Sequence, residues 1–187
     1  AATARGLSDQ VVNLAGEAAE AAAALAKAKS EAKSMAESIA KLSATYVEKL
    51  AVLVEEMQGI RGAVAIRSRE SARELGDVIQ EISSKLQTHA EKVERTPTAE
   101  ACESLLEDMR ADSEDARERS RYCDDEMRDA RNYAEQELAD LAREKARKDA
   151  LEGAINEAAE LAGVCRKLVN DAWQAYKGTS SVLNNTD

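Results

Sequence analysis

The stretch EAAEAAAALAKAKSEAKSMAESIAKL, residues 17–42, decides the fold. More than a third of it is alanine, which has the highest helix propensity and almost no side-chain entropy to lose on folding. The stretch therefore stays helical with little packing support, and its small side chains let neighbouring helices approach closely. Because each alanine buries only about one methyl group, such a bundle is stabilised by its length more than by its width.

Apolar residues continue the same pattern before and after this stretch. They recur mostly every three or four residues, which is the spacing of one face of a helix that packs as in a coiled coil. No proline interrupts them, so the sequence predicts one long helix over about residues 4–58. The face comprises Leu7, Val11, Leu14, Ala18, Ala22, Leu25, Ala32, Met35, Ile39, Leu42, Tyr46, Leu50, Leu53, Met57 and Ile60.

Glycine and proline mark the next boundaries. Gly59 and Gly62 give the backbone the freedom to reverse, and a second apolar pattern then predicts a helix over about residues 64–95. The segment Thr96-Pro97-Thr98 ends this helix, because proline cannot continue the hydrogen-bond ladder. Either threonine can cap the helix that follows.

The second half of the chain predicts two further helices and a tail. A short helix spans about residues 98–110, and Asp112 or Ser113 then serves as the N-cap of a long helix over about residues 113–177. Residues 178–187 form a polar tail. The apolar face of the long helix comprises Ala116, Cys123, Met127, Ala130, Ala134, Leu138, Leu141, Leu151, Ile155, Ala158, Ala162, Cys165, Val169, Ala172 and Tyr176.

These segments predict an all-α fold in a single domain over residues 1–187. The domain is an elongated antiparallel bundle of three to four helices with coiled-coil-like packing. In this arrangement the two long helices run antiparallel, and both chain termini lie at the same end.

Composition and charge exclude several functions. The net charge of −10 and the pI near 4.8 argue against nucleic acid as a partner, because phosphate binding needs a basic face. The same charge disfavours docking on anionic lipid. No run of 18 apolar residues is present, so the sequence predicts no segment that crosses a membrane.

The chain has three cysteines, an odd number that cannot pair completely within one chain. If the chain turns near Asp112, Cys102 and Cys123 reach the same height on antiparallel helices, where a disulfide is geometrically allowed. The alternative is that all three are buried, reduced thiols. Cys165 lies on the apolar face and is predicted to be a small core residue.

No pattern for catalysis or metal binding is present. His89 is the single histidine and has no second ligand one turn away, so a hydrogen-bonded interfacial histidine is favoured over a metal ligand. The acidic residues Asp108, Asp112, Glu114 and Asp115 lack the glycine and the closing glutamate of an EF-hand loop. The sequence predicts no catalytic, cofactor-binding or metal-binding residue, and no enzymatic activity.

Two features lie near the C-terminus. Asn184 opens the triplet Asn184-Asn185-Thr186, which matches the acceptor pattern for N-glycosylation. Trp173 and Tyr176 are one helical turn apart, and they form either an aromatic plug that closes the bundle or exposed anchors for a partner.

The segment AGEAAEAAAALAKAKSEAKSMAESIAKL, the glycine-flanked reversal, TPTAEACESLLEDM and the acidic last helix resemble the glutamic acid/alanine-rich protein of African trypanosomes. That protein is a surface coat glycoprotein similar in architecture to the core of variant surface glycoproteins and to the haptoglobin-haemoglobin receptor. The resemblance implies a non-enzymatic coat glycoprotein on the extracellular face of the plasma membrane. It also implies a GPI anchor attached after removal of a C-terminal signal, with neighbouring coat molecules and a host or vector protein as partners.

Two other functions fit the same residues. A surface receptor on this scaffold would bind a host protein through one helical face, although no residue here can be matched to such a site. Helices rich in alanine and glutamate also occur in intracellular coiled-coil proteins that bind partner helices. The three hypotheses share the fold and differ in location and partner.

Overall fold

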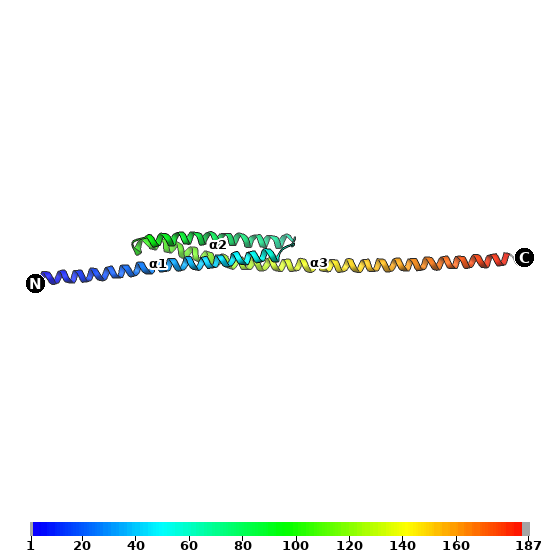
Figure 1. Cartoon of the computed structure of the whole chain (residues 1–187), viewed down its shortest axis with the longest axis horizontal. Helices are drawn as coiled ribbons and strands as arrows, with labels where there is room; N and C mark the ends of the chain where they lie inside the picture. The colour runs from blue at the N-terminus through cyan, green and yellow to red at the C-terminus, as the bar shows by residue number, and fades with distance from the viewer. Residues whose placement is uncertain (1, 185–187) are drawn as a thin grey trace. The chain divides into compact units, whose positions relative to one another are not determined.

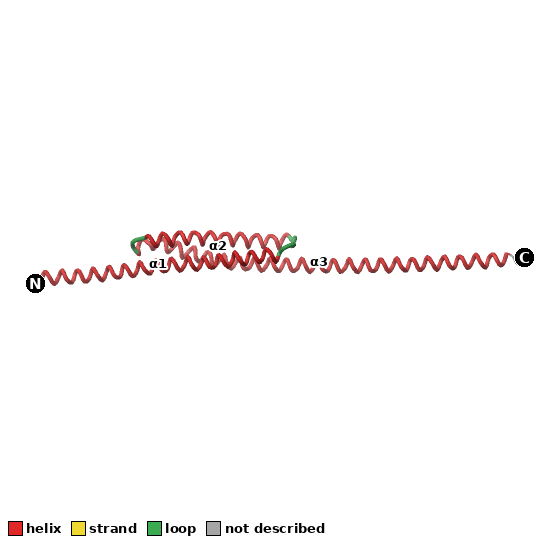
Figure 2. Tube along the Cα trace, in the orientation of Figure 1, coloured by secondary structure: helices red, strands yellow, loops and turns green. Residues whose placement is uncertain are grey.

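The computed structural model describes the backbone of residues 2–184 and the side chains of residues 10–179. Over these residues the chain forms three helices and no strand, which confirms the all-α fold class. The helices are α1 (Ala2–Glu56), α2 (Ala63–Arg95) and α3 (Ala99–Asn184), shown in Figure 1. Two short loops join them, one at each end of α2 (Figure 2).

The chain divides into two compact units, where the sequence predicted a single domain. Unit 1 is Ala1–Glu135 and unit 2 is Gln136–Asp187. Helices α1 and α2 and the first part of α3 belong to unit 1, and the remainder of α3 belongs to unit 2.

Unit 1 is a three-helix bundle in which α1 and α3 run parallel. Glu31 of α1 accepts a hydrogen bond from Arg110 of α3 at 2.8 Å, and Glu56 accepts one from Arg131 at 2.7 Å. Because the two pairs follow the same order along both helices, the helices share a direction. The prediction that the two long helices run antiparallel is therefore wrong.

Helix α2 runs against both of them. Near its C-terminal end, the carbonyl of Glu94 accepts a hydrogen bond from Lys29 of α1 at 2.6 Å. Further toward the N-terminal end of α2, Gly76 lies against Leu50, so later residues of α1 meet earlier residues of α2. A Cβ atom at position 76 would overlap the Leu50 side chain, and glycine therefore lets the two helices come close at this level.

The turn predicted near Asp112 is absent, because α3 continues through it. Ser113 is only 2% exposed and occupies a core position, while Asp112 pairs with Lys85 of α2 at 2.8 Å. Both side chains thus serve the packing of the bundle and not a helix cap. The helix instead begins after Thr98, whose hydroxyl accepts a hydrogen bond from the backbone of Ala101 at 3.3 Å.

The predicted short helix over 98–110, the long helix over 113–177 and part of the tail are consequently one helix. The backbone of α3 remains helical through residues 178–184, where the sequence predicted a polar tail. The rest of that tail, residues 185–187, lies outside the described residues.

The reversal between α1 and α2 was predicted correctly from its glycines. Gly59 has a φ of +89°, a left-handed conformation that other residues rarely adopt. The amide of Ile60 donates a hydrogen bond to the carbonyl of Met57 at 3.2 Å, which closes the turn. The next helix then begins at Ala63.

The core of unit 1 consists of two clusters of buried side chains, each drawn from all three helices. In the first cluster α1 contributes mainly alanine, and the larger side chains come from α2 and α3. Small residues on one helix thus accommodate large ones on the others, as close packing requires. The alanines are Ala28, Ala32 and Ala36, and the larger partners include Leu86, Val93, Leu106 and Met109.

Candidate functional site

The two cysteines predicted to bridge lie on one helix and cannot bond within the chain. Cys102 and Cys123 are both on α3, about 32 Å apart at 1.5 Å per residue. Both are free and buried, and the thiol of Cys123 donates to the carbonyl of Ala72 at 3.3 Å. The disulfide prediction is therefore wrong because it depended on the absent turn, and the alternative of three buried thiols agrees with the structure for Cys102 and Cys123 but not for Cys165.

Cys165 was predicted to be a core residue, and this prediction is also wrong. Its thiol is free and exposed in unit 2. The apolar pattern around it is real, but no side chain of the described chain covers it. The glycosylation prediction at Asn184 lies outside the residues whose side chains are described.

A polar cluster joins α1 to α3 inside unit 1. The Tyr46 hydroxyl donates to Asp124 at 2.6 Å and lies 2.8 Å from the carbonyl of Ser120. Lys49 completes the cluster, because its ammonium donates to Asp124 at 2.9 Å and lies 4.6 Å from the centre of the Tyr46 ring. These contacts set the register between the two parallel helices.

The chemistry of this cluster favours a structural role. Burial raises the pKa of Tyr46, and the hydrogen bond to Asp124 raises it further. Burial alone would raise the pKa of Asp124, but hydrogen bonds from Tyr46 and Lys49 hold it below its usual value. Burial also raises the pKa of the neighbouring Cys123 thiol to about 11. At neutral pH the phenol and thiol are thus protonated, which disfavours either as a nucleophile.

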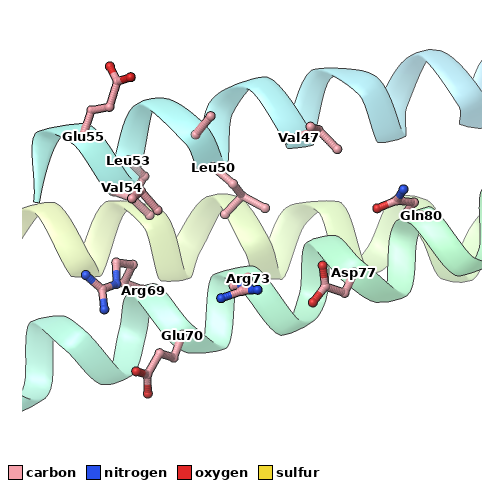
Figure 3. Close-up of a pocket in the computed structure, with 11 residues that line it drawn as sticks. Val47, Leu50, Leu53, Val54, Glu55, Arg69, Glu70, Arg73, Asp77 and Gln80 are labelled. Atoms are coloured by element: carbon pink, nitrogen blue, oxygen red, sulfur yellow. The ribbon is translucent and has the colours of Figure 1, made fainter.

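A groove of about 630 Å³ lies between α1 and α2 (Figure 3). Leu50, Leu53 and Val54 of α1 form its apolar side and face α2, while Glu55 points away from α2. Its other side is charged, and the signs alternate along α2 in Arg69, Glu70, Arg73 and Asp77. Because charges of both signs are interspersed, the groove concentrates no field of one sign.

Neither a metal site nor a membrane span is found among the described residues. No three His, Cys, Asp or Glu side chains within them gather closely enough to hold a metal ion. His89 is half-buried, and within the described structure its Nδ1 has no hydrogen-bond partner, which differs from the satisfied histidine that was predicted. In the same part of the chain, no helix combines the length and the apolar character needed to span a bilayer.

A long apolar feature outside the core lies in unit 2. Residues 138–179 are exposed, although their apolar side chains keep the three-and-four spacing of a packing face. We call this face the exposed stripe. Its members are Leu151, Ile155, Ala158, Ala162, Cys165, Val169, Ala172 and Tyr176.

A second row of apolar residues flanks the exposed stripe. Leu161 and Leu168 are 65% and 63% exposed, and Ala154 and Ala175 lie in the same row. The sequence interpretation missed this row because it followed one residue per turn. Counting three apolar positions in every seven would have found it, and that wider pattern is typical of a helix that packs in a bundle.

The aromatic pair lies on the surface of unit 2. Trp173 and Tyr176 stack with ring centres 5.8 Å apart, and Lys177 lies 5.6 Å from the centre of the Trp173 ring. Both rings are more than half exposed. Of the two interpretations, exposed anchors therefore agree with the structure and a plug does not.

A shorter apolar face is exposed near the start of α1. Val11, Val12 and Leu14 are each about two-thirds exposed, and they precede the alanines that enter the core.

Comparison of the chain with models of protein families, with curated proteins and with solved structures finds no match.

Proposed function

We propose that this chain is a non-catalytic protein that works by helix–helix contact. Unit 1 is a self-contained bundle with a buried core, and unit 2 is a helix that binds a partner helix along the exposed stripe. The observation that carries the proposal is the exposed stripe itself. Every one of its members is apolar and exposed, and together they extend over a segment of 26 residues.

The length and composition of the stripe support this proposal. It extends about 38 Å along α3 at 1.5 Å per residue, nearly four heptads, which is the length typical of coiled-coil pairing. Burial of each large aliphatic side chain is worth about 1.5–3 kcal/mol, so leaving the whole stripe in water is unfavourable. Contiguous exposed patches of this kind typically mark a protein interface.

The proposal can be tested by photo-crosslinking in the cells that produce the protein. A photoreactive amino acid at Leu168 is expected to form a covalent adduct with the partner helix, because that side chain lies in the apolar row that flanks the exposed stripe. The matched control carries the same group at Gln174, six residues further along α3 and on the face of the helix away from the exposed stripe. Adducts at position 168 but not at 174 support the proposal, whereas no adduct at 168 contradicts it.

We propose further that the protein is a GPI-anchored coat glycoprotein on the extracellular face of a parasite plasma membrane. Support comes from the resemblance in the alanine-rich stretch and the TPTAEACESLLEDM segment, and from the all-α helical layout. The net charge of −10 supports dense display as well, since like charges keep neighbouring molecules apart. A host or vector protein and neighbouring coat molecules are the proposed partners.

Treatment of intact cells with a phosphatidylinositol-specific phospholipase tests this second proposal. The expected result is release of the protein into the medium, together with labelling of the untreated cells by an antibody without permeabilisation. Labelling only after permeabilisation would instead favour an intracellular coiled-coil protein. Saturable binding of one host serum protein would favour a receptor over a coat protein.

A further inference from the structure

We infer that the partner of the exposed stripe is a second copy of this chain, paired antiparallel about a two-fold axis between residues 163 and 164. This inference rests on the proposed function, because it names the helix that the stripe binds. Two independent features carry it: the sizes of the facing side chains and the distribution of charge along unit 2.

The facing side chains complement one another in size. With the axis at this position, Ile155 of one copy lies opposite Ala172 of the other, and Val169 lies opposite Ala158. Each of these two layers thus combines a large side chain with a small one, which fills the seam without overlap. Parallel in-register pairing would instead place Ala158 on Ala158 and Ala172 on Ala172, which leaves gaps.

The same register also completes the centre and the ends of the seam. Ala162 lies opposite Cys165 beside the axis, so the helices approach closely there. At either end Leu151 packs on Tyr176, and in the flanking row Leu161 and Leu168 of the two copies lie within about 3 Å of the same height along the axis. The whole exposed stripe is covered by its own counterpart in this arrangement, and no apolar residue of the stripe is left without a facing residue.

Charge along unit 2 favours the antiparallel direction. Residues 149–163 carry four acidic side chains and no basic one, namely Asp149, Glu152, Glu157 and Glu160. Residues 164–179 carry three basic side chains and one acidic one, namely Arg166, Lys167, Lys177 and Asp171. Antiparallel pairing places the acidic half over the basic half, whereas parallel pairing would place acidic residues beside acidic residues.

Sedimentation equilibrium of the full chain tests the inference. The wild-type protein is expected to form a concentration-dependent dimer, and Ile155→Glu is expected to weaken dimerisation at least about 100-fold because the carboxylate enters two layers of the seam. Gln174→Glu adds the same charge to the polar face of the helix and is expected to leave the dimer unchanged. A monomeric wild-type protein, or a dimer that survives Ile155→Glu, overturns the inference.

A second variant excludes pairing through the other exposed apolar face. Leu14→Glu is expected to leave the dimer intact, because Leu14 lies on α1, outside the exposed stripe. Loss of the dimer in this variant would overturn the inference, since it would assign the contact to α1.

The direction of pairing is tested with spin labels at Gln174→Cys in a Cys165→Ala background, where the remaining Cys102 and Cys123 are buried. Antiparallel pairing separates the two labels by about 32 Å along the helix axis, and parallel pairing brings them level. Level labels contradict the inference. If the protein is monomeric but Leu168 still crosslinks to a different protein, self-pairing fails while the proposed function holds.

Discussion

The two halves of α3 carry the same pattern with opposite outcomes. From Cys102 to Ala134 the heptad positions are buried, even though two of them are serine, Ser113 and Ser120. From Leu151 to Tyr176 every such position is apolar, yet all of them are exposed. The first half is buried in clusters that α1 and α2 share, so burial depends on the presence of partner helices and not on apolar spacing alone. Apolar spacing predicts that a face will pack, but it does not identify the partner.

The largest contrast is expected in the reactivity of the thiols. At a concentration where the chain is monomeric, Cys165 should react with a thiol reagent at once. Cys123 should react on the order of 10³-fold more slowly, because unit 1 must open first. Titration with a chromogenic disulfide reagent should count one thiol in the native protein and three in denaturant. Only one thiol in denaturant would restore the disulfide between Cys102 and Cys123.

Truncation of a leucine to alanine should cost several kcal/mol more unfolding free energy at a buried position of unit 1 than at an exposed position of unit 2. Leu86→Ala removes a side chain that is 0% exposed and should lower the free energy of unfolding of unit 1 by about 2–5 kcal/mol. Leu161→Ala removes a side chain that is 65% exposed and should change it by less than about 0.5 kcal/mol. Urea unfolding monitored by circular dichroism measures both, and equal losses would contradict the contrast.

Replacing an alanine of α3 by leucine should change the stability of unit 1 by a smaller amount. The buried position should again be more sensitive than the exposed one. Ala130→Leu adds volume at a position that is 0% exposed and should destabilise unit 1 by about 1–3 kcal/mol. Ala158→Leu makes the same change at an exposed position and should leave unit 1 unaltered. Thermal unfolding of the two variants at low concentration distinguishes them, and a stable Ala130→Leu protein would argue against a close-packed core.

Removing one hydroxyl should cost less still. Tyr46→Phe deletes the hydrogen bonds to Asp124 and to the carbonyl of Ser120, and should lower the stability of unit 1 by about 1 kcal/mol. Tyr176→Phe is the matched control in unit 2 and should have no effect, because that side chain is exposed. If the two variants unfold at the same urea concentration, the polar cluster does not hold α1 to α3.

The smallest predicted effect is a dependence on acid. The pKa of Asp124 is lower in the folded protein than its ordinary value of 3.8. Its contribution to stability is therefore present above that value and is lost as the pH falls through the lower folded pKa. Asp124→Asn should flatten this part of the stability profile below about pH 4, and only slightly, because the side chain is half exposed. If the stability profile of the variant is the same as that of the wild-type protein, Asp124 does not contribute to the dependence of stability on acid.

Local signals in the sequence predicted the first two helices closely. The helix predicted over about 4–58 is Ala2–Glu56, and the one predicted over about 64–95 is Ala63–Arg95. Glycine at the reversal and Thr98 before α3 act through their own backbone neighbours, so a sequence is enough to recognise them. The predicted core positions of α1, such as Ile39, Tyr46 and Leu53, are buried as well, because their apolar spacing marks a face that packs against α2 and α3.

The errors arose where a distant residue decides the outcome. Asp112 and Ser113 have the composition of an N-cap, but Asp112 pairs with Lys85, 27 residues away, and Ser113 is buried in the bundle. Because α3 continues where that turn was predicted, the last helix runs in the opposite direction to the predicted one, and Cys102 and Cys123 lie far apart on a single helix. For the exposed stripe, the spacing predicted an apolar face correctly, but the sequence could not say that no helix of the described chain covers it.

Amide hydrogen exchange, measured peptide by peptide at a concentration where the chain is monomeric, tests the division of α3 most directly. We expect strong protection of peptides from residues 102–134 and rapid exchange in residues 151–176, because a single helix without packing partners is marginal in water. Protection of the second segment should appear only as the concentration rises. Equal protection of both segments in the monomer would contradict the account, since it would mean that the chain covers the stripe itself.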